Sequence, residues 1–533
     1  MFSIPLKQLF CSICLFLTVI IGIVYLSYND KIIEKDVEYF FSKVNTKEVK
    51  EESLDERNNK LSRNELNSTL YNLIEGMPIQ DEHWCERMIN GDLSINETKR
   101  LKEWKFNEEN FYVEPPPDED EMDEGIEITE EDDKCLNLQK LFLFHNKPLS
   151  KEESQYPLAY AMVTHKSVIQ TMTMVSSVYQ PQNAYCIVVD DKSSDKFLKK
   201  IQMLADCFPN IFVLNVGTIE WCKFGVVRAV FSCLKHLTEK NHNWRYLQYL
   251  SGVDLPLKTN LEMVRIFKQL NGTINADVLP FERYRVRLLK GSIKPPLTLW
   301  KSSLSALISR EAADVMVKSD KVKNLLNYLQ YTWCSDESLW ATIAGNPEEL
   351  KIPGGFDAKF FYYSLLRESE RCITTQKSTF KSLEQQQQKN NKTSIKTPLP
   401  PFTNSFQLSS FYISRYQIWN QKRYKHPITR TGKQLARCYG KFVKESCVFG
   451  VDDMPNLIRR PELVAHKMYM DFEPAAYFCL WKKVRERALD WREQKTFNAQ
   501  VYSQLPSVRI ARGDPEEQIQ YFFDDICHLS ISG

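Results

Sequence analysis

The stretch Tyr246-Leu-Gln-Tyr-Leu-Ser-Gly-Val-Asp-Leu-Pro-Leu-Lys-Thr-Asn260 decides the fold that we expect for this chain. Its first five residues are aromatic and apolar enough for a buried strand, and Gly252 and Pro256 then stop that strand. Asp254 is left in the loop at the carboxyl end of the strand, where open α/β sheets usually bind their ligands. The simpler interpretation is that Asp254 only caps or braces a turn.

The segments before this stretch follow a β-α-β-α-β rhythm, which predicts a mostly parallel sheet covered on both faces. Buried strands are expected at residues 158–163, 185–190 and 211–214. Another helix, over 228–237, leads into the quoted stretch, and Thr259 or Asn260 can cap the helix that follows it. No GxGxxG or GxxxxGK[ST] motif occurs, which excludes a dinucleotide fingerprint and a phosphate loop. We expect an α/β fold of the nucleotide-binding type.

The amino-terminal segment 9–26 carries no charge and is long enough to cross a bilayer. We interpret it as a signal anchor behind a cytoplasmic tail, residues 1–8. A cleaved signal peptide is the alternative, but no small-x-small cleavage site follows the apolar run. A charged stem over 27–80 then precedes a lumenal domain over 81–490, and residues 491–533 form an extension without a readable motif.

Other features of the sequence agree with a lumenal position. Four glycosylation triplets begin at Asn67, Asn96, Asn271 and Asn391. Twelve of the 14 cysteines follow the apolar segment, which suits an oxidising compartment. These cysteines form no CxxC pair and histidines are few, so we expect no metal site. The net charge of +2 gives no reason to expect a nucleic-acid partner. Residues 368–405 read as a low-complexity insertion.

Four stretches, in order, carry a family resemblance. They are Tyr185-Cys-Ile-Val-Val-Asp-Asp-Lys-Ser193, Ser251-Gly-Val-Asp-Leu-Pro-Leu-Lys-Thr-Asn260, Ser335-Asp-Glu-Ser-Leu-Trp-Ala-Thr342 and Ser446-Cys-Val-Phe-Gly450. Together they resemble the core 2 and I-branching β-1,6-N-acetylglucosaminyltransferases, whose branch domain is shared with protein O-xylosyltransferases. The resemblance implies a GT-A-like fold in a type II Golgi membrane protein. It also implies inverting transfer of GlcNAc from UDP-GlcNAc to the 6-hydroxyl of a Gal or GalNAc on glycoprotein O-glycans.

Two other functions stay open at this point. One is xylosyl transfer to a serine of a core protein. The other is a catalytically silent ectodomain that binds glycans or partner enzymes.

The reaction needs a base, because the acceptor hydroxyl must lose its proton as it attacks. By the resemblance this base is Glu337. Ser335 is well placed to cap a helix that begins at Asp336, which would put Glu337 in the first turn near the positive end of the helix dipole. Asp336 is the rival base. Without the resemblance, Glu337 would be an ordinary residue at a helix start.

The departing UDP needs positive charge. The family uses basic side chains and no metal, and Asp190-Asp191 lacks the Asp-x-Asp spacing of a metal site. By the resemblance, Asp190 contacts the uridine part of the donor, and Val163 and His165 form the wall beside it. Lys467 matches a lysine on the diphosphate. Lys444 takes the place of an arginine there, so the charge is kept and the bidentate fork is lost. We expect no cofactor beyond the donor substrate.

The resemblance also suggests acceptor contacts and disulfides. Glu282 lies near an acidic acceptor ligand of the family, and Tyr416 or Trp419 lies near its aromatic platform. The family pattern pairs Cys85 with Cys479, Cys135 with Cys207, Cys186 with Cys233, and Cys438 with Cys447. Without the resemblance, His165 and the two aromatic residues would be core side chains, and the two lysines would be surface charges.

Overall fold

The computed structural model describes residues 66, 69–70, 73–108, 134–286, 293–364, 411–420 and 437–515. The chain divides into two compact units, Met1–Asn64 and Glu65–Gly533, and every described residue belongs to the second. The expected anchor over 9–26 and the insertion over 368–405 lie outside the described residues. Within the described residues, no helix has the length and apolar character needed to cross a membrane.

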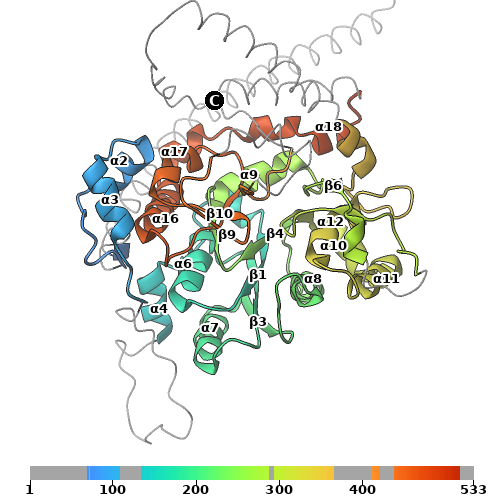
Figure 1. Ribbon diagram of the computed structural model, residues 1–533, viewed down its shortest axis with the longest axis horizontal. Helices are drawn as coiled ribbons and strands as arrows, with labels where there is room; N and C mark the ends of the chain where they lie inside the picture. The colour runs from blue at the N-terminus through green and yellow to red at the C-terminus, as the bar shows by residue number, and fades with distance from the viewer. Residues whose placement is uncertain are drawn as a thin grey trace, which may run out of the picture. The chain divides into compact units, whose positions relative to one another are not determined.

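A five-stranded sheet forms the centre of the described unit (Figure 1). Its strand order is β3-β2-β1-β4-β8, in which β8 runs antiparallel to β4 and the other pairs are parallel. The strands are β1 (Leu158–Thr164), β2 (Ala184–Val189), β3 (Ile211–Asn215), β4 (Tyr246–Ser251) and β8 (Leu307–Ser309). The four expected strands are confirmed to within two residues at each end, because near-continuous apolar runs suit strands buried on both faces.

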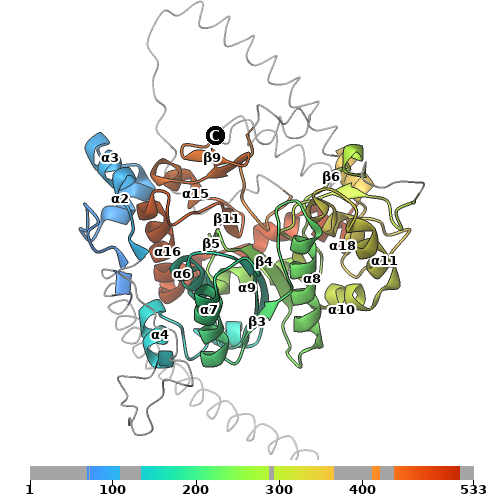
Figure 2. The ribbon, with the colours of Figure 1, turned by 60° about the horizontal axis from the view of Figure 1, so that its bottom comes forward.

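Three helices connect the parallel strands and cover both faces of the sheet. These helices are α6 (Val168–Val178), α7 (Asp195–Cys207) and α8 (Phe224–Glu239). The chain moves outward from β1 to β3 and then returns past β1 to place β4. Right-handed crossovers therefore put α8 on the face opposite α6 and α7, as Figure 2 shows. The strand order reverses between β1 and β4, and α/β sheets bind ligands at such a switch point.

The prediction that Asp254 lies in a loop is wrong. Asp254 begins a short strand, which belongs to a second, small sheet. β5 (Asp254–Pro256) pairs antiparallel with β11 (Val464–His466). The helix α9 (Asn260–Leu270) follows, and Thr259 caps it through a capping box with Glu262, which confirms one of the two expected caps.

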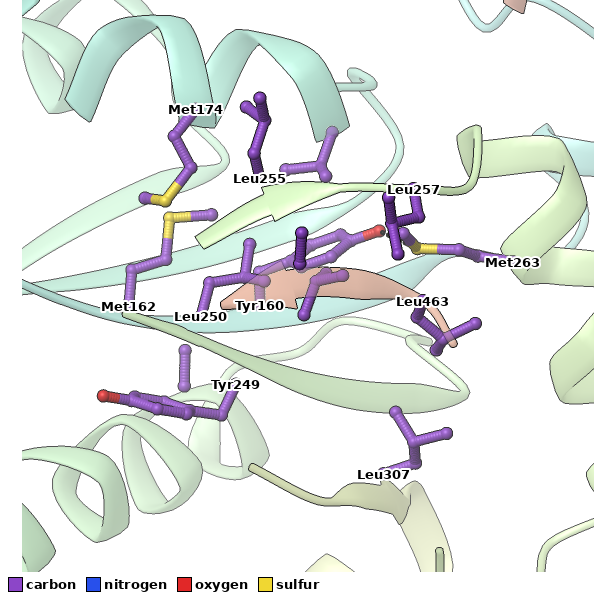
Figure 3. Close-up of a cluster of buried hydrophobic side chains, with 14 of the residues drawn as sticks. Tyr160, Met162, Met174, Tyr249, Leu250, Leu255, Leu257, Met263, Leu307 and Leu463 are labelled. Carbon is purple, nitrogen blue, oxygen red and sulfur yellow. Dashed lines mark hydrogen bonds between the residues drawn. The ribbon is translucent and has the colours of Figure 1, made fainter. Parts of the chain in front are cut away.

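The core fills the space between the five-stranded sheet, the small β5–β11 sheet and the helices around them. Figure 3 shows Tyr160 and Met162 of β1 beside Met174 of α6, with Leu255 of β5 above them. Neighbouring strand residues point to opposite faces, so Tyr249 packs on the other side of β4. These side chains bury the face of the parallel sheet that lies against β5 and α6.

The remaining elements surround this core. Before the sheet lie α2 (Trp84–Asn90), α3 (Ile95–Glu103), α4 (Lys134–Phe142) and α5 (Lys151–Ser154). After α9 come β6 (Leu279–Pro280), η4 (Arg283–Val286), β7 (Trp300–Lys301), α10 (Arg310–Lys318), α11 (Asp320–Leu329), η5 (Ser335–Ser338) and α12 (Trp340–Ala344). The carboxyl-terminal part contains β9 (Lys441–Val443), β10 (Ser446–Val448), η6 (Val451–Asp453), α15 (Met454–Leu457), α16 (Pro474–Leu489), α17 (Trp491–Thr496), η7 (Ala499–Gln504) and α18 (Pro506–Arg512).

Both predicted domain boundaries differ from the structure. Leu66, Leu70 and Leu73 are buried in the core, so the folded unit begins inside the segment expected to be a stem. At the other end, η7 packs on α9, and the Tyr502 hydroxyl donates to the Pro461 carbonyl over 2.7 Å. Leu66, Leu70 and Leu73 follow the i, i+4, i+7 spacing of a helix face, a signal that the sequence analysis did not use.

Five disulfides link the described cysteines. The four expected pairs, Cys85–Cys479, Cys135–Cys207, Cys186–Cys233 and Cys438–Cys447, are confirmed. A fifth, Cys222–Cys334, was not expected. Of the four glycosylation sites, Asn96 and Asn271 are exposed, whereas Asn67 and Asn391 lie outside the described residues.

Candidate active site

The expected uridine residues lie at the carboxyl ends of β1 and β2, which are neighbouring parallel strands. Asp190 follows β2, and its Oδ1 accepts the backbone N–H groups of Lys192 at 3.2 Å and Ile219 at 3.0 Å. The carboxylate therefore holds the loop after β3 against the end of β2. Val163 lies at the end of β1 and His165 just beyond it. Desolvation of the imidazole, then the charge of Lys166, lowers the pKa of His165, so its ring is neutral at pH 7.

Two lysines lie near this edge. Lys444 and Glu445 form the turn between β9 and β10 with φ of 47° and 67°, as a two-residue type I′ hairpin turn requires. Lys467 follows β11, and its Nζ donates to the Val443 carbonyl over 3.3 Å. Burial, then the charge of Lys444, lowers the pKa of Lys467 to about 8. The repulsion between the charges of Lys444 and Lys467 favours binding of an anionic group such as a diphosphate.

Glu337 lies in the short 3-10 helix η5, and the expected cap is wrong. Cys334, with a left-handed φ of 49°, precedes this helix, and the Ser335 hydroxyl is buried without a hydrogen bond to any described residue. The Glu337 N–H donates to the Cys334 carbonyl at 3.0 Å, and its own carbonyl accepts from Ser302 at 2.8 Å. Backbone contacts, and not a serine cap, therefore hold Glu337 in place.

Four charged side chains meet at this point, and we call them the carboxylate–cation cluster: Glu282, Arg285, Lys301 and Glu337. Arg285 Nη2 lies 2.5 Å from Glu337 Oε2 and 2.6 Å from Glu282 Oε2. Lys301 Nζ lies 3.5 Å from Glu337 Oε2 and 3.2 Å from Glu282 Oε2. The cations are nearly buried, whereas the Glu337 side chain is 24% exposed. The predicted base and the predicted acidic acceptor residue thus share two cations and reach solvent.

Charge pairing lowers the pKa of Glu282 in this cluster. Burial alone would raise the pKa of Glu282, but Lys301 and Arg285 hold it below its ordinary value. Sequence reasoning missed Arg285 and Lys301. Arg285 lies in a basic stretch that could not be aligned residue by residue with the family's basic acceptor residues. Lys301 is a single charge beside Trp300 in a two-residue strand.

Asp336 points away from this cluster into the protein. Its Oδ1 is buried and accepts no hydrogen bond from any described residue. Burial, then the charge of Glu337, raises the pKa of Asp336 to about 7. The Oδ1 atom of Asp336 is buried, whereas the Glu337 side chain is 24% exposed and pairs with two cations, so the geometry favours Glu337 over its rival.

Asp254 is the centre of a buried polar network. It is 0% exposed, and its Oδ1 lies 2.6 Å from His466 Nδ1. Its Oδ2 accepts the Ser251 N–H at 2.7 Å and lies 3.8 Å from Arg415 Nη2. Burial, then the charge of Arg415, lowers the pKa of His466 to about 4, so a neutral ring carries its proton on Nδ1 to make this bond. The simpler interpretation, in which Asp254 braces the turn, is the one that this geometry supports.

Tyr416 and Trp419, the two aromatic residues predicted to bind the acceptor, make other contacts than those of the carboxylate–cation cluster. The Tyr416 ring stacks on Phe449 at 5.5 Å, and the Arg460 guanidinium lies 4.1 Å from its centroid. Trp419 pairs through its backbone with Ser446 of β10. Both faces of Tyr416 are therefore engaged in packing. A role in acceptor binding for either residue stays a prediction.

The family-model match and the similar proteins point to the same group of enzymes. Residues 158–387 match the family model described as "Core-2/I-Branching enzyme". The Homo sapiens protein named beta-1,3-galactosyl-O-glycosyl-glycoprotein beta-1,6-N-acetylglucosaminyltransferase is 28% identical over 429 residues, which cover 76% of this chain and 86% of the human protein. The Rattus norvegicus protein of that name with the suffix 3 is 33% identical over 226 residues, covering 39% of this chain and 52% of its own.

A solved structure, that of S. aureus TarS 1–349, aligns with 33% of this chain and 56% of its own at 10% identity. The TM-score of 0.20 is too low for this likeness to carry any argument. The matched residues include the whole central sheet and the carboxylate–cation cluster. Three of the four motifs read from the sequence lie within the match, and the fourth, Ser446–Gly450, lies beyond it. Residues 158–387 therefore form a domain similar to the core-2/I-branching enzymes. The chain as a whole is similar to proteins named beta-1,6-N-acetylglucosaminyltransferases.

Proposed function

We propose that this protein is a β-1,6-N-acetylglucosaminyltransferase that moves GlcNAc from UDP-GlcNAc to the 6-hydroxyl of a Gal or GalNAc in an O-glycan. The observation that carries this proposal is the carboxylate–cation cluster, in which Glu337 reaches solvent beside Glu282. The names of the relatives supply the sugar and the linkage.

The chemistry assigns one role to each part of the site. Glu337 takes the proton of the acceptor 6-hydroxyl as that oxygen attacks the anomeric carbon of GlcNAc. The bond between this carbon and the diphosphate breaks on the opposite side, so the configuration inverts. Arg285 and Lys301 hold the Glu337 side chain in position through ion pairs, and Glu282 shares both cations.

The departing UDP is stabilised by the two lysines. Its negative charge grows as the bond breaks, and fixed cations in a partly buried site stabilise such charge strongly. Lys444 and Lys467 supply this charge, which supports turnover without a divalent metal. We also propose a type II Golgi membrane position, which rests on the apolar segment 9–26 and the acceptor class.

A transfer assay tests the proposal directly. Full-length protein purified in detergent is incubated with UDP-GlcNAc or UDP-xylose and a panel of galactosides, N-acetylgalactosaminides and serine peptides, with and without EDTA. The expected product is a β-1,6-linked GlcNAc that forms in both conditions. Xylose on serine would assign the protein to the xylosyltransferases, and no transfer to any acceptor would favour a silent binding ectodomain.

A further inference from the structure

The fifth disulfide joins the loop before α8 to the turn that carries the predicted base. Cys222 and Cys334 form this bond, and neither belongs to the four pairs that the family resemblance implies. The two residues are 4% and 3% exposed. The bond therefore lies inside the protein, three residues before Glu337 in the sequence.

Both cysteines hold the backbone in a conformation that residues with a side chain rarely adopt. The φ angle is 59° at Cys222 and 49° at Cys334, in the left-handed region that favours glycine. Other residues stay in this region only where the surrounding contacts enforce it, and such residues cluster at active sites. Two contacts enforce it at Cys334, namely the disulfide and the N–H that donates to the Cys222 carbonyl at 3.0 Å.

The turn at Cys334 fixes the predicted base through hydrogen bonds. The Cys334 carbonyl accepts the Glu337 N–H at 3.0 Å and Arg285 Nη1 at 3.2 Å. The same guanidinium lies 2.5 Å from the Glu337 carboxylate through its Nη2. One carbonyl therefore positions both the backbone of Glu337 and the cation that holds its side chain. A rotation of the Cys334 peptide would disturb both contacts together.

The loop at the other end of the disulfide is anchored beside the predicted uridine site. Ile219, three residues before Cys222, donates its N–H to Asp190 Oδ1 over 3.0 Å. After Cys222, the backbone of Gly225 packs so closely that a Cβ there would lie 2.6 Å from the Thr218 carbonyl oxygen. The disulfide thus links the predicted base to a loop that is already fixed at the donor side.

We propose that the Cys222–Cys334 disulfide is a positioning element for the transfer reaction, which fixes the left-handed turn at Cys334 and thereby holds Glu337 in place relative to the donor site. This inference rests on the proposed function and adds two positioning residues to it. The cysteines act through Glu337 and not on the substrate. Their effect on the rate follows from the dependence of the reaction on a precise placement of the base.

Steady-state kinetics of a double variant test this role. Full-length Cys222→Ala/Cys334→Ala is compared with the unchanged protein. The backbone hydrogen bond between the two positions and the contact of the Trp221 and Trp333 rings at 6.4 Å remain, so the variant should fold. We expect kcat to fall about 10- to 100-fold, because a displacement of about 1 Å costs up to about 100-fold in rate. KM for UDP-GlcNAc should stay close to its original value, since Asp190 keeps its bond to the loop.

A second variant separates the turn from the covalent bond. Cys222→Ala/Cys334→Gly also lacks the disulfide, but glycine adopts a left-handed φ without a steric penalty. It should recover most of the lost kcat, which a role in global stability does not predict. The matched control is Cys135→Ala/Cys207→Ala, which removes the disulfide between α4 and α7. This control should lower the urea midpoint of unfolding and leave kcat unchanged.

Hydrogen–deuterium exchange gives a readout that does not depend on catalysis. Amides of residues 335–340 should exchange faster in the alanine pair than in the unchanged protein, and more slowly again in the glycine variant, while amides of α16 keep their rates. If the unchanged protein transfers no sugar to any acceptor, the proposed function fails, but this measurement still shows whether the disulfide fixes the turn.

Three results would overturn the proposal. They are an unchanged kcat or unchanged exchange at 335–340 in the alanine pair, an equal loss of kcat in the alanine and glycine variants, and an alanine pair that does not fold. The last result would make the disulfide a requirement for folding and not a device for positioning the base.

Discussion

Asp336→Asn should stabilise the protein, and the gain should grow with pH. The Asp336 carboxyl is buried beside Glu337, and its pKa is about 7 in place of the ordinary 3.8. A carboxyl whose pKa is raised by folding binds its proton more tightly in the folded state than in the unfolded state. Its contribution is therefore most favourable below pH 3.8 and is lost as the pH rises through 7.

The size of the effect follows from the two pKa values. Each unit of pKa difference corresponds to about 1.4 kcal/mol. The penalty for folding with Asp336 is then about 2 kcal/mol at pH 5 and about 4 kcal/mol at pH 8. Asparagine does not titrate in this range, so the difference in unfolding free energy between the two proteins should increase by about 2 to 3 kcal/mol between these pH values.

Urea unfolding followed by tryptophan fluorescence at pH 5, 6.5 and 8 measures this difference. Because the unfolding free energies of the two proteins are subtracted at each pH, the titration of groups that both proteins share cancels. Asp320→Asn is the control, because that side chain is 88% exposed at the start of α11 and its substitution should change stability little at any pH. A difference that stays constant from pH 5 to pH 8, or that falls, would refute the raised pKa of Asp336.

The remaining predictions concern the reaction. Glu337→Gln should lower the rate of transfer by about 100- to 10,000-fold while UDP binding persists, and a near-normal rate would move the base elsewhere. Lys467→Ala should raise the donor KM more than Lys467→Arg, because charge matters more than shape at the diphosphate. Donor affinity should fall as the pH rises above 8, since the pKa of Lys467 is about 8 and the neutral amine no longer attracts phosphate; UDP titration by calorimetry at pH 7 and 9 measures this. Excess EDTA should leave the rate unchanged, and loss of turnover that Mn²⁺ restores would make Asp190 a metal ligand.

Local features of the chain were predictable. The strands of the central sheet follow from apolar runs, and the cap at Thr259 follows from a serine-type hydroxyl three residues before Glu262. Four disulfides followed from the family resemblance and agree with the structure. The cap at Ser335 failed because the left-handed turn at Cys334, joined to Cys222, produces a 3-10 helix in place of an α-helix start.

The sequence by itself determined the strands of the parallel sheet, because buried strands depend on near neighbours in the chain. The choice of Glu337 as the base came from the family resemblance and stays a prediction. Only the tertiary structure decided which charges surround Glu337. Arg285 lies 52 residues from it in sequence, and the Ser302 N–H that fixes its backbone comes from a separate loop. Neither contact leaves a periodic signal, because a salt bridge requires two side chains to meet and places no constraint on the residues between them.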